Sequence, residues 1–390
     1  MTSRRPIRGV AALAAGALVW GMAAGPAWAD NIRDQQWALQ AYKASTNVWP
    51  ISEGDGVTVA VIDTGVNASH QDLTGQVLSG ADFSGTQGDG RTDDQGHGTG
   101  MASLIAGHGH GDQAGVMGLA PKVKILPVRL ALSEVGDVQA AQDDKFADAL
   151  RFAVDHGAKV VSMSIGGPMR TNPADRAAVN YALSRDVVLV AASGNLTSTV
   201  AYPAAFPGVV AVGAIDRMGN LWAKSDQGPE LTLVGPGVGI TVAGNKSSTD
   251  YGYSDGTSDA TAYVSAIAAL VRSKYPNLTA GQVIRRMITS AAAPPDHSQV
   301  PNDRYGYGIA SPSKSLADNP AVDNGPRDNP LLSRVESQGA PDSLAAAPTP
   351  AAAAAGTGGG TTVWLYAAAA VLVVLIVAGV AVLVRRAAGR

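Results

Sequence analysis

Short apolar runs and longer amphipathic or apolar segments alternate along most of the chain. Runs of four to eight residues rich in Val, Ile and Ala are typical of buried strands, and the longer segments are typical of helices. The predicted strands are 57–63, 123–130, 160–164, 187–192 and 209–214, and the predicted helices are 98–106, 145–156, 175–184, 260–275 and 279–290. A closing segment at 305–316 ends the pattern. This alternation predicts an α/β fold in three layers, with a mostly parallel sheet flanked by helices on both faces.

The first 29 residues have the pattern of a secretory signal. Three arginines, Arg4, Arg5 and Arg8, precede an apolar stretch, and Ala27-Trp28-Ala29 provides a small-x-small cleavage site. An uncleaved anchor helix is the alternative, and the cleavage site argues against it. The following 30–56 segment is polar with scattered aromatic residues, and we expect this N-terminal extension to wrap around a catalytic domain spanning 30–316.

The C-terminal part of the chain changes character after residue 316. Residues 317–362 are rich in Pro, Ala and Gly, which predicts a linker. The 22 residues 363–384 carry no charge, which is long enough for a transmembrane helix, and the basic tail 385–390 suits the cytoplasmic side. The sequence therefore predicts a single-pass protein of the cell membrane, with the catalytic domain outside the cell.

Composition and charge exclude several classes of function. Without the six arginines of 1–29 and 385–390, 23 basic and 32 acidic residues remain, a net charge of −9. Such a surface does not favour nucleic acid or anionic lipid. The chain has no cysteine, so disulfides, thiolate catalysis and cysteine-bound metals are excluded.

Three glycine-flanked residues have the chemistry of a hydrolase. Asp63 ends the first predicted strand, His97 stands in Gly-His-Gly before a helical stretch, and Ser258 follows Gly-Thr at the start of a largely apolar one. A nucleophile, a general base and a residue that orients the base are the minimum for covalent hydrolysis. Singly, each has an ordinary alternative: a strand-end acceptor, a turn histidine and a helix cap.

The motifs together resemble the subtilisin-type serine proteases. They are Val-Ile-Asp-Thr-Gly around Asp63, Gly-His-Gly-Thr around His97, Gly-Thr-Ser around Ser258 and Ala-Ala-Ser-Gly-Asn ending at Asn195. Gln-Gln-Trp at 35–37, Arg-Tyr-Gly-Tyr-Gly at 304–308 and the predicted tail anchor narrow the similarity to the mycosins of type VII secretion. The resemblance implies a serine endopeptidase with an Asp63–His97–Ser258 triad and Asn195 as oxyanion-hole donor.

The same resemblance implies how a polypeptide substrate would bind. In subtilases the peptide adds as a strand beside the catalytic serine, so Ser164, Ile165, Gly166 and Gly194 are the predicted substrate-binding residues. Ordinary strand ends are the alternative for these positions. Asp89, Asp93 and Asp94 share one loop, but acidic loop residues are usually solvated, so we predict neither a metal site nor a cofactor.

Two questions stay open at the level of sequence. Asp259 follows the nucleophile, and its carboxylate either caps the helix and points away or lies close enough to His97 to favour the imidazolium form. The second question concerns function. An outward-facing endopeptidase with few substrates, linked to type VII secretion, is the leading interpretation. The alternative is a structural component of a secretion complex whose protease activity is dispensable.

Overall fold

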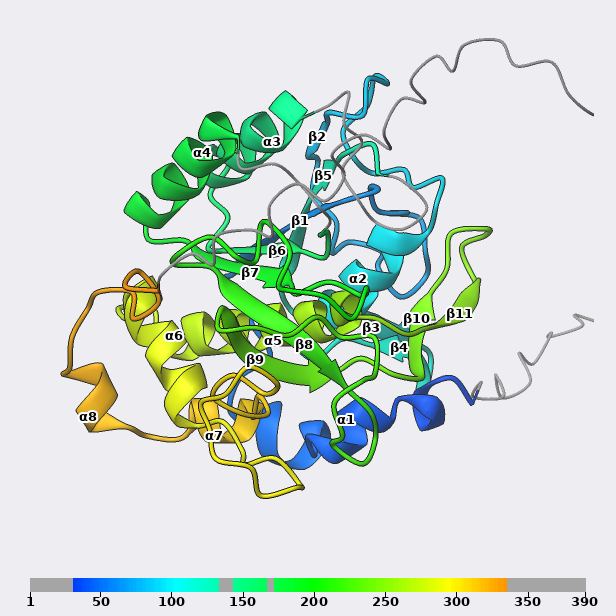
Figure 1. Cartoon of the computed structure of the whole chain (residues 1–390). Helices are drawn as coiled ribbons and strands as arrows, with labels where there is room; N and C mark the ends of the chain where they lie inside the picture. Colours follow the sequence, from blue (N-terminus) through cyan, green and yellow to red (C-terminus); the bar gives the residue numbers. More distant parts are fainter. Residues whose placement is uncertain (1–30, 133–142, 167–171, 335–390) are drawn as a thin grey trace, which may run out of the picture. The chain divides into compact units, whose positions relative to one another are not determined.

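The computed structural model describes residues 31–132, 143–166 and 172–334 (Figure 1). Their strands are β1 Thr58–Asp63, β2 Ala81–Asp82, β3 His108–His110, β4 Ala114–Met117, β5 Lys124–Arg129, β6 Val160–Met163, β7 Val188–Ala192, β8 Val210–Ile215, β9 Leu231–Pro236, β10 Ile240–Ala243 and β11 Tyr251–Ser254. Their helices are α1 Trp37–Ala41, α2 His97–Ala106, α3 Asp143–Asp155, α4 Pro173–Ser184, α5 Thr257–Lys274, α6 Ala280–Thr289, α7 Pro312–Leu316 and α8 Pro320–Asp323, with short turns η1 Arg33–Gln35 and η2 Ala44–Val48.

A seven-stranded sheet forms the middle layer, in the order β2-β5-β1-β6-β7-β8-β9. Every pair of neighbours in it is parallel, as the sequence predicted for most of the sheet. Strand β1 lies between β5 and β6, so the order of the strands along the chain reverses there. In open α/β sheets the carboxyl ends of strands at such a reversal are where ligands bind.

Successive residues of the central strands face opposite layers, which is why nearly all of them are apolar. Val59 and Val61 of β1 belong to the hydrophobic core shared with α2, α5 and α6. Ala60 and Ile62 belong to a second core shared with α3 and α4. The predicted three-layer α/β fold is therefore confirmed.

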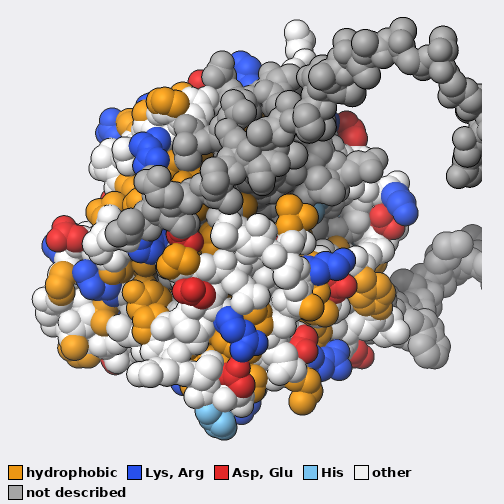
Figure 2. Space-filling model, viewed as in Figure 1, with side chains coloured by type: hydrophobic (Ala, Val, Ile, Leu, Met, Phe, Trp, Pro, Cys, Tyr) orange, Lys and Arg blue, Asp and Glu red, His pale blue; other side chains and the backbone are white. Residues whose placement is uncertain are grey.

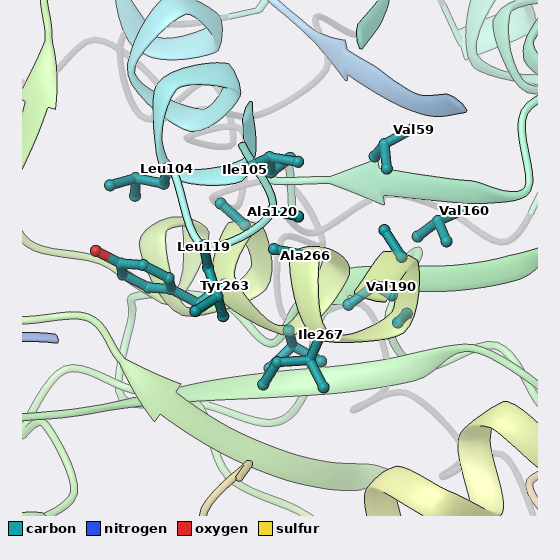
Figure 3. Packing of buried hydrophobic residues seen from close by; sticks show 14 of the residues in the cluster. Val59, Leu104, Ile105, Leu119, Ala120, Val160, Val190, Tyr263, Ala266 and Ile267 are labelled. Atoms are coloured by element: carbon teal, nitrogen blue, oxygen red, sulfur yellow. The ribbon is translucent and has the colours of Figure 1, made fainter. Parts of the chain in front are cut away.

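Helix α5 runs through the first of these cores and is buried along almost its whole length. Figure 3 shows Leu104 and Ile105 of α2 on one side of α5 and Ile267 of α5 pointing to the other side, within the same hydrophobic core. A helix that is apolar on all sides needs neighbours on all sides. The helix starts at Thr257, one turn earlier than predicted, so Ser258 lies in its first turn.

Local signals explain where the outer helices begin. Asn172 accepts a hydrogen bond from the Ala174 amide before α4, and Pro173 takes the first helical position. A capping box between Thr279 and Gln282 begins α6. These helices start within a few residues of their predicted positions.

Several elements were not predicted from the sequence. Strand β9 extends the sheet by one more parallel strand, and two antiparallel hairpins, β3–β4 and β10–β11, lie outside the sheet. The residues of β11, Tyr-Gly-Tyr-Ser, are partly or fully exposed, and a short exposed strand with glycine gives a weak periodic signal.

The N-terminal extension packs on the folded domain, as predicted. Trp37 is buried and its indole N–H donates to the Val238 carbonyl. Gln36 forms two hydrogen bonds with the backbone of Met117 in β4, donating from Nε2 at 2.8 Å and accepting at Oε1 at 2.9 Å. The extension is thus fixed by specific polar contacts as well as by apolar burial.

The packed part of the chain ends later than the predicted boundary at residue 316. Asp323, in α8, forms a two-pronged ion pair with the buried Arg286 of α6, at 2.6 and 2.7 Å. Leu331 is fully buried, and Arg334 donates to the carbonyls of Val209 and Glu230. Residues 317–334 therefore belong to the domain, and assigning them to the linker was wrong, because a few polar anchors rather than an apolar pattern hold them.

The remaining predictions for the chain ends concern residues outside the described ranges. These are the signal 1–29, the rest of the linker, the membrane helix 363–384 and the tail 385–390. None of the helices in the described ranges 31–132, 143–166 and 172–334 combines the length and the apolar character needed to cross a bilayer. On the face drawn in Figure 2, acidic and basic side chains of the described residues are intermingled.

Candidate active site

Asp63 and His97 form the hydrogen-bonded pair that the motifs predicted. Asp63 is the last residue of β1 and has no exposed surface, and His97 is the first residue of α2. His97 Nδ1 lies 2.7 Å from Asp63 Oδ1, and about a third of the histidine side chain, 32%, is exposed. A buried carboxylate on Nδ1 fixes the ring so that Nε2 is available as a base.

Close packing between α2 and β1 makes this contact possible. A Cβ added at Gly98 would lie 2.1 Å from the Gly65 carbonyl oxygen and 3.2 Å from Asp63 Oδ1. Both contacts are too short for a side chain, and the first is with backbone that cannot move aside. The glycine after His97 is therefore required for the histidine to reach the carboxylate.

Asp93 holds the start of α2 in place, a role that sequence reasoning missed. Its Oδ1 accepts from the Gly96 amide at 2.8 Å, and its Oδ2 accepts from the amide and the hydroxyl of Thr99 at 2.9 and 2.6 Å. The side chain is nearly buried rather than solvated. Its position a few residues before a predicted helix was the signal that could have identified it as a capping acid.

The two other acids of this loop also have protein partners. Asp94 forms an ion pair with Arg129 at 2.6 Å, and Asp89 accepts from the hydroxyl of Ser79. Within the described residues, no group of three or more His, Asp or Glu side chains is placed to hold a metal ion.

Ser258 lies in the first turn of α5, which packs against α2. Its hydroxyl donates to the Ser164 carbonyl at 3.1 Å, and the Ser164 hydroxyl donates to the Ser258 carbonyl at 3.0 Å. Among the described residues, no hydrogen bond joins Ser258 to His97. The helix start leaves the Ser258 amide without an intrahelical acceptor, as an oxyanion donor requires.

Asn195 follows β7 and is oriented by the residue before the nucleophile. Asn195 Oδ1 accepts from the amide and the hydroxyl of Thr257, at 3.0 and 2.9 Å. Since the carbonyl end of the amide is occupied, the Nδ2 end is left to donate. Thr257 is a second residue that sequence reasoning missed, because its role depends on the meeting of α5 with the end of β7.

Asp226 fixes the loop that carries Asn195. Its Oδ1 accepts from the amides of Leu196 and Ser198, at 2.9 and 2.6 Å. Gly194 has φ +114°, and a Cβ there would lie 2.1 Å from Asp226 Oδ2, so only glycine fits. Burial raises the pKa of Asp226, and the two amide hydrogen bonds oppose that rise.

The predicted substrate-binding residues follow two neighbouring strands of the sheet. Ser164, Ile165 and Gly166 come after β6, and Gly194 comes after β7, which pairs with β6. Ile165 is buried in the core under α3 and α4, and the Ser164 side chain is also buried. At these two positions only the main chain is available to a peptide, which fits recognition by strand addition.

Two titratable groups near the nucleophile have strongly shifted pKa values. Partial desolvation lowers the pKa of His97, but the charge and hydrogen bond of Asp63, together with the charges of Asp259 and Asp93, raise it overall to about 9. Burial raises the pKa of Asp259 to about 7, although the Ser254 hydrogen bond and the charge of His97 oppose the rise. Near neutral pH His97 therefore carries a proton, and Asp259 is close to half ionised.

The sequence model of the subtilase family matches residues 54–308, a range that contains Asp63, His97, Asn195, Ser258 and the whole parallel sheet. The chain belongs to the subtilase family. It is thus a hydrolase of the serine-protease class, as the motifs predicted.

Individual relatives support the same assignment. A thermophilic serine proteinase from Bacillus sp. (strain AK1) is 39% identical over 233 residues, which are 59% of this chain and 55% of the relative. Subtilisin DY from Bacillus licheniformis is 37% identical over 245 residues, 61% of this chain and 85% of the relative. The subtilase described here thus spans little more than half of the first relative's length.

A solved structure refines the relationship. The structure of the MycP3 protease from the type VII (ESX-3) secretion system matches this subtilase with a TM-score of 0.65 and 31% sequence identity, covering 73% of this chain and 88% of that one. The predicted similarity to the mycosins is confirmed.

Proposed function

We propose that this subtilase is an active endopeptidase that cleaves polypeptides through Ser258, His97, Asp63 and Asn195. The observation that carries the proposal is the Asp63–His97 pair at 2.7 Å, with His97 on α2, a helix that packs against α5, whose first turn holds Ser258 and whose Thr257 orients the Asn195 amide. A base, a nucleophile and oxyanion donors are then all present.

In the proposed mechanism, His97 Nε2 takes the proton of Ser258 Oγ as that oxygen attacks the scissile carbonyl. Asp63 accepts a hydrogen bond from the Nδ1–H of His97 throughout and stabilises the imidazolium, while that proton stays on His97. The Ser258 amide and Asn195 Nδ2 donate to the oxyanion, and His97 then passes its proton to the leaving amine. Attack by water, with His97 again as base, releases the acyl group from Ser258.

The Ser258 hydroxyl must change partner before it attacks. It donates to the Ser164 carbonyl in this structure, and rotation about its Cα–Cβ bond would exchange that acceptor for His97. We propose that a bound peptide favours the exchange, because its own N–H groups would use the main-chain acceptors beside Ser164 and Gly166. Gly194, which has no side chain, would let the substrate peptide lie close to the nucleophile.

The activity is tested on the full-length protein in detergent, with an unfolded casein as substrate and Ser258→Ala as the matched control. The proposal predicts cleavage by the wild type and none above background by the variant. Equal cleavage by both proteins would assign the activity to a contaminant, and no cleavage by either would leave the scaffold role as the better description.

We also propose that the enzyme faces outward from the cell membrane on its C-terminal anchor and acts with a type VII secretion machine. The 363–384 segment and the similarity to the MycP3 protease support this proposal. The protein should then stay with membranes after salt extraction and be released by detergent. If the Ser258→Ala variant fully restores secretion to cells that lack the gene, secretion requires the protein as a structural component and does not require its protease activity.

A further inference from the structure

Asp259 is a fully buried acid directly after the nucleophile. Its Oδ2 accepts from the Ser254 hydroxyl at 2.8 Å, and its Oδ1 has no hydrogen-bond partner among the described residues. The N-cap of α5 is Gly256, and the first amide of the helix, that of Thr257, donates to Asn195 and not to Asp259. A buried carboxyl group with half of its acceptors unused is costly unless it is protonated or serves a neighbour.

The charged groups around Asp259 and His97 identify that neighbour. Three negative charges raise the pKa of His97: those of Asp63 at the end of β1, Asp93 in the loop before α2 and Asp259 in α5. The charge of His97 lowers the pKa of Asp259, and the charge of Asp255 raises it. The charge of Asp259 in turn raises the pKa of the Tyr263 phenol. Among the described residues whose charges act on Asp259, His97 is the one that can be a cation.

We propose that Asp259 is a positioning residue that restrains the enzyme: as a carboxylate it holds His97 in the imidazolium form and opposes the oxyanion that forms beside Ser258. The proposal rests on the proposed peptidase activity. Asp259 is a buried acid of the nucleophile turn, whereas Asp63 is hydrogen-bonded to His97 directly and Asp93 accepts hydrogen bonds from the amides of Gly96 and Thr99.

The sign of the effect follows from the role of His97. The histidine must be neutral to take the Ser258 proton, so kcat/KM falls on the acid side of the pKa of His97. An anion at position 259 raises that pKa and moves the acid limb to higher pH. Removing the anion moves the limb to lower pH and raises the rate at every pH along it.

The test compares Asp259→Asn with wild-type full-length protein in detergent between pH 5 and pH 10. Asparagine keeps the shape and the acceptor for Ser254 but has no charge. We expect the acid limb of kcat/KM to move down by about half to one pH unit, which is a rise of roughly three- to tenfold in rate on the limb. KM should change little.

A second readout does not depend on turnover. The titration of the His97 imidazole is followed by NMR, with its resonance assigned by loss in His97→Ala, and it should shift by the same amount and in the same direction. If the wild type cleaves nothing yet this shift appears, the proposed activity fails while the coupling of Asp259 to His97 stands.

Two further variants make the result specific. Ser254→Ala removes the hydrogen bond that favours the Asp259 carboxylate. The acid limb of kcat/KM and the His97 titration should both shift in the same direction as in Asp259→Asn, by a smaller amount. Ser254→Ala also replaces Asp259→Asn as the test variant if Asp259→Asn does not fold. Asp255→Asn removes an exposed charge four residues away and should shift neither by more than about 0.2 pH units. Unchanged titration of His97 in both Asp259→Asn and Ser254→Ala would overturn the proposal, as would an equal shift in Asp255→Asn.

Discussion

Two Asp–His pairs of closely similar geometry lie among the described residues, and one of them is the proposed catalytic pair. His97 Nδ1 is 2.7 Å from Asp63, and His110 Nδ1 is 2.6 Å from Asp72. In both pairs the carboxylate has no exposed surface and the histidine is 32% exposed. Distance and burial alone therefore do not distinguish a catalytic pair from a structural one.

The difference lies in the second oxygen of each carboxylate. Asp72 Oδ2 accepts from the Val116 amide at 2.7 Å and from the Tyr251 hydroxyl at 2.8 Å, so this acid joins the hairpins β3–β4 and β10–β11. Asp63 Oδ2 has no hydrogen-bond partner among the described residues. The charge of Asp72 is shared among structural donors, whereas the charge of Asp63 is available to an imidazolium on His97.

Substitution of the proposed nucleophile should have the largest effect on rate. Ser258→Ala should lower kcat by about 10⁶-fold and leave the cooperative thermal transition in place, because the hydroxyl makes a single hydrogen bond within the described residues. Peptide turnover and a melting curve on the same preparation measure both effects. Residual turnover of more than a few per cent would remove Ser258 from the mechanism.

Matched substitutions in the two pairs should differ strongly in their effect on rate. Asp63→Asn keeps the side chain's shape but favours the wrong tautomer of His97, so kcat should fall by about 10⁴-fold. The measurement is kcat for a peptide substrate at a pH where wild-type His97 is neutral. A loss below tenfold would mean that His97 does not depend on Asp63 for its orientation.

The oxyanion donor should have the next largest effect. Asn195→Ala removes the amide that Thr257 orients and should lower kcat by about 10²- to 10³-fold with little change in KM. A rise in KM at constant kcat would instead make Asn195 a binding residue. Thr257→Ala should have a smaller effect in the same direction, since the amide remains but can rotate.

A substitution in the Asp72–His110 pair should lower the stability of the protein and leave its rate of catalysis nearly unchanged. Asp72→Asn places an amide where three donors converge, and unfolding should become about 1–3 kcal/mol easier because one of those donors loses its acceptor. Denaturant titration measures this loss, and kcat should stay within about twofold of the wild type. A large fall in kcat without destabilisation would show that the two pairs are not separate in function.

Much of this site could be predicted from the sequence because short motifs encode it. The residues of β1 place Asp63 at the carboxyl end of the strand, and the glycines before His97 and Ser258 mark the helix starts that hold these two residues. Asp93 and Thr257 were missed because their roles arise only when separate elements meet. The Ser254 contact was missed for the same reason, since it comes from the unpredicted strand β11.

The end of the domain illustrates the limit of hydropathy patterns. Residues 317–334 contain few apolar positions, and their attachment rests on Asp323 with the buried Arg286 and on Arg334 with three carbonyl groups. A buried guanidinium needs such partners to offset its desolvation, but nothing in a periodicity pattern identifies them.

Covalent labelling with a fluorophosphonate, followed by peptide mapping with mass spectrometry, tests the central claim most directly. The reagent needs a serine activated by a base and an oxyanion hole, so it reports on the assembled site rather than on any single residue. We predict one adduct, on Ser258, formed much more slowly in Asp63→Asn and at an unchanged rate in Asp72→Asn. An adduct on another serine, or no adduct on folded wild-type protein, would contradict the account.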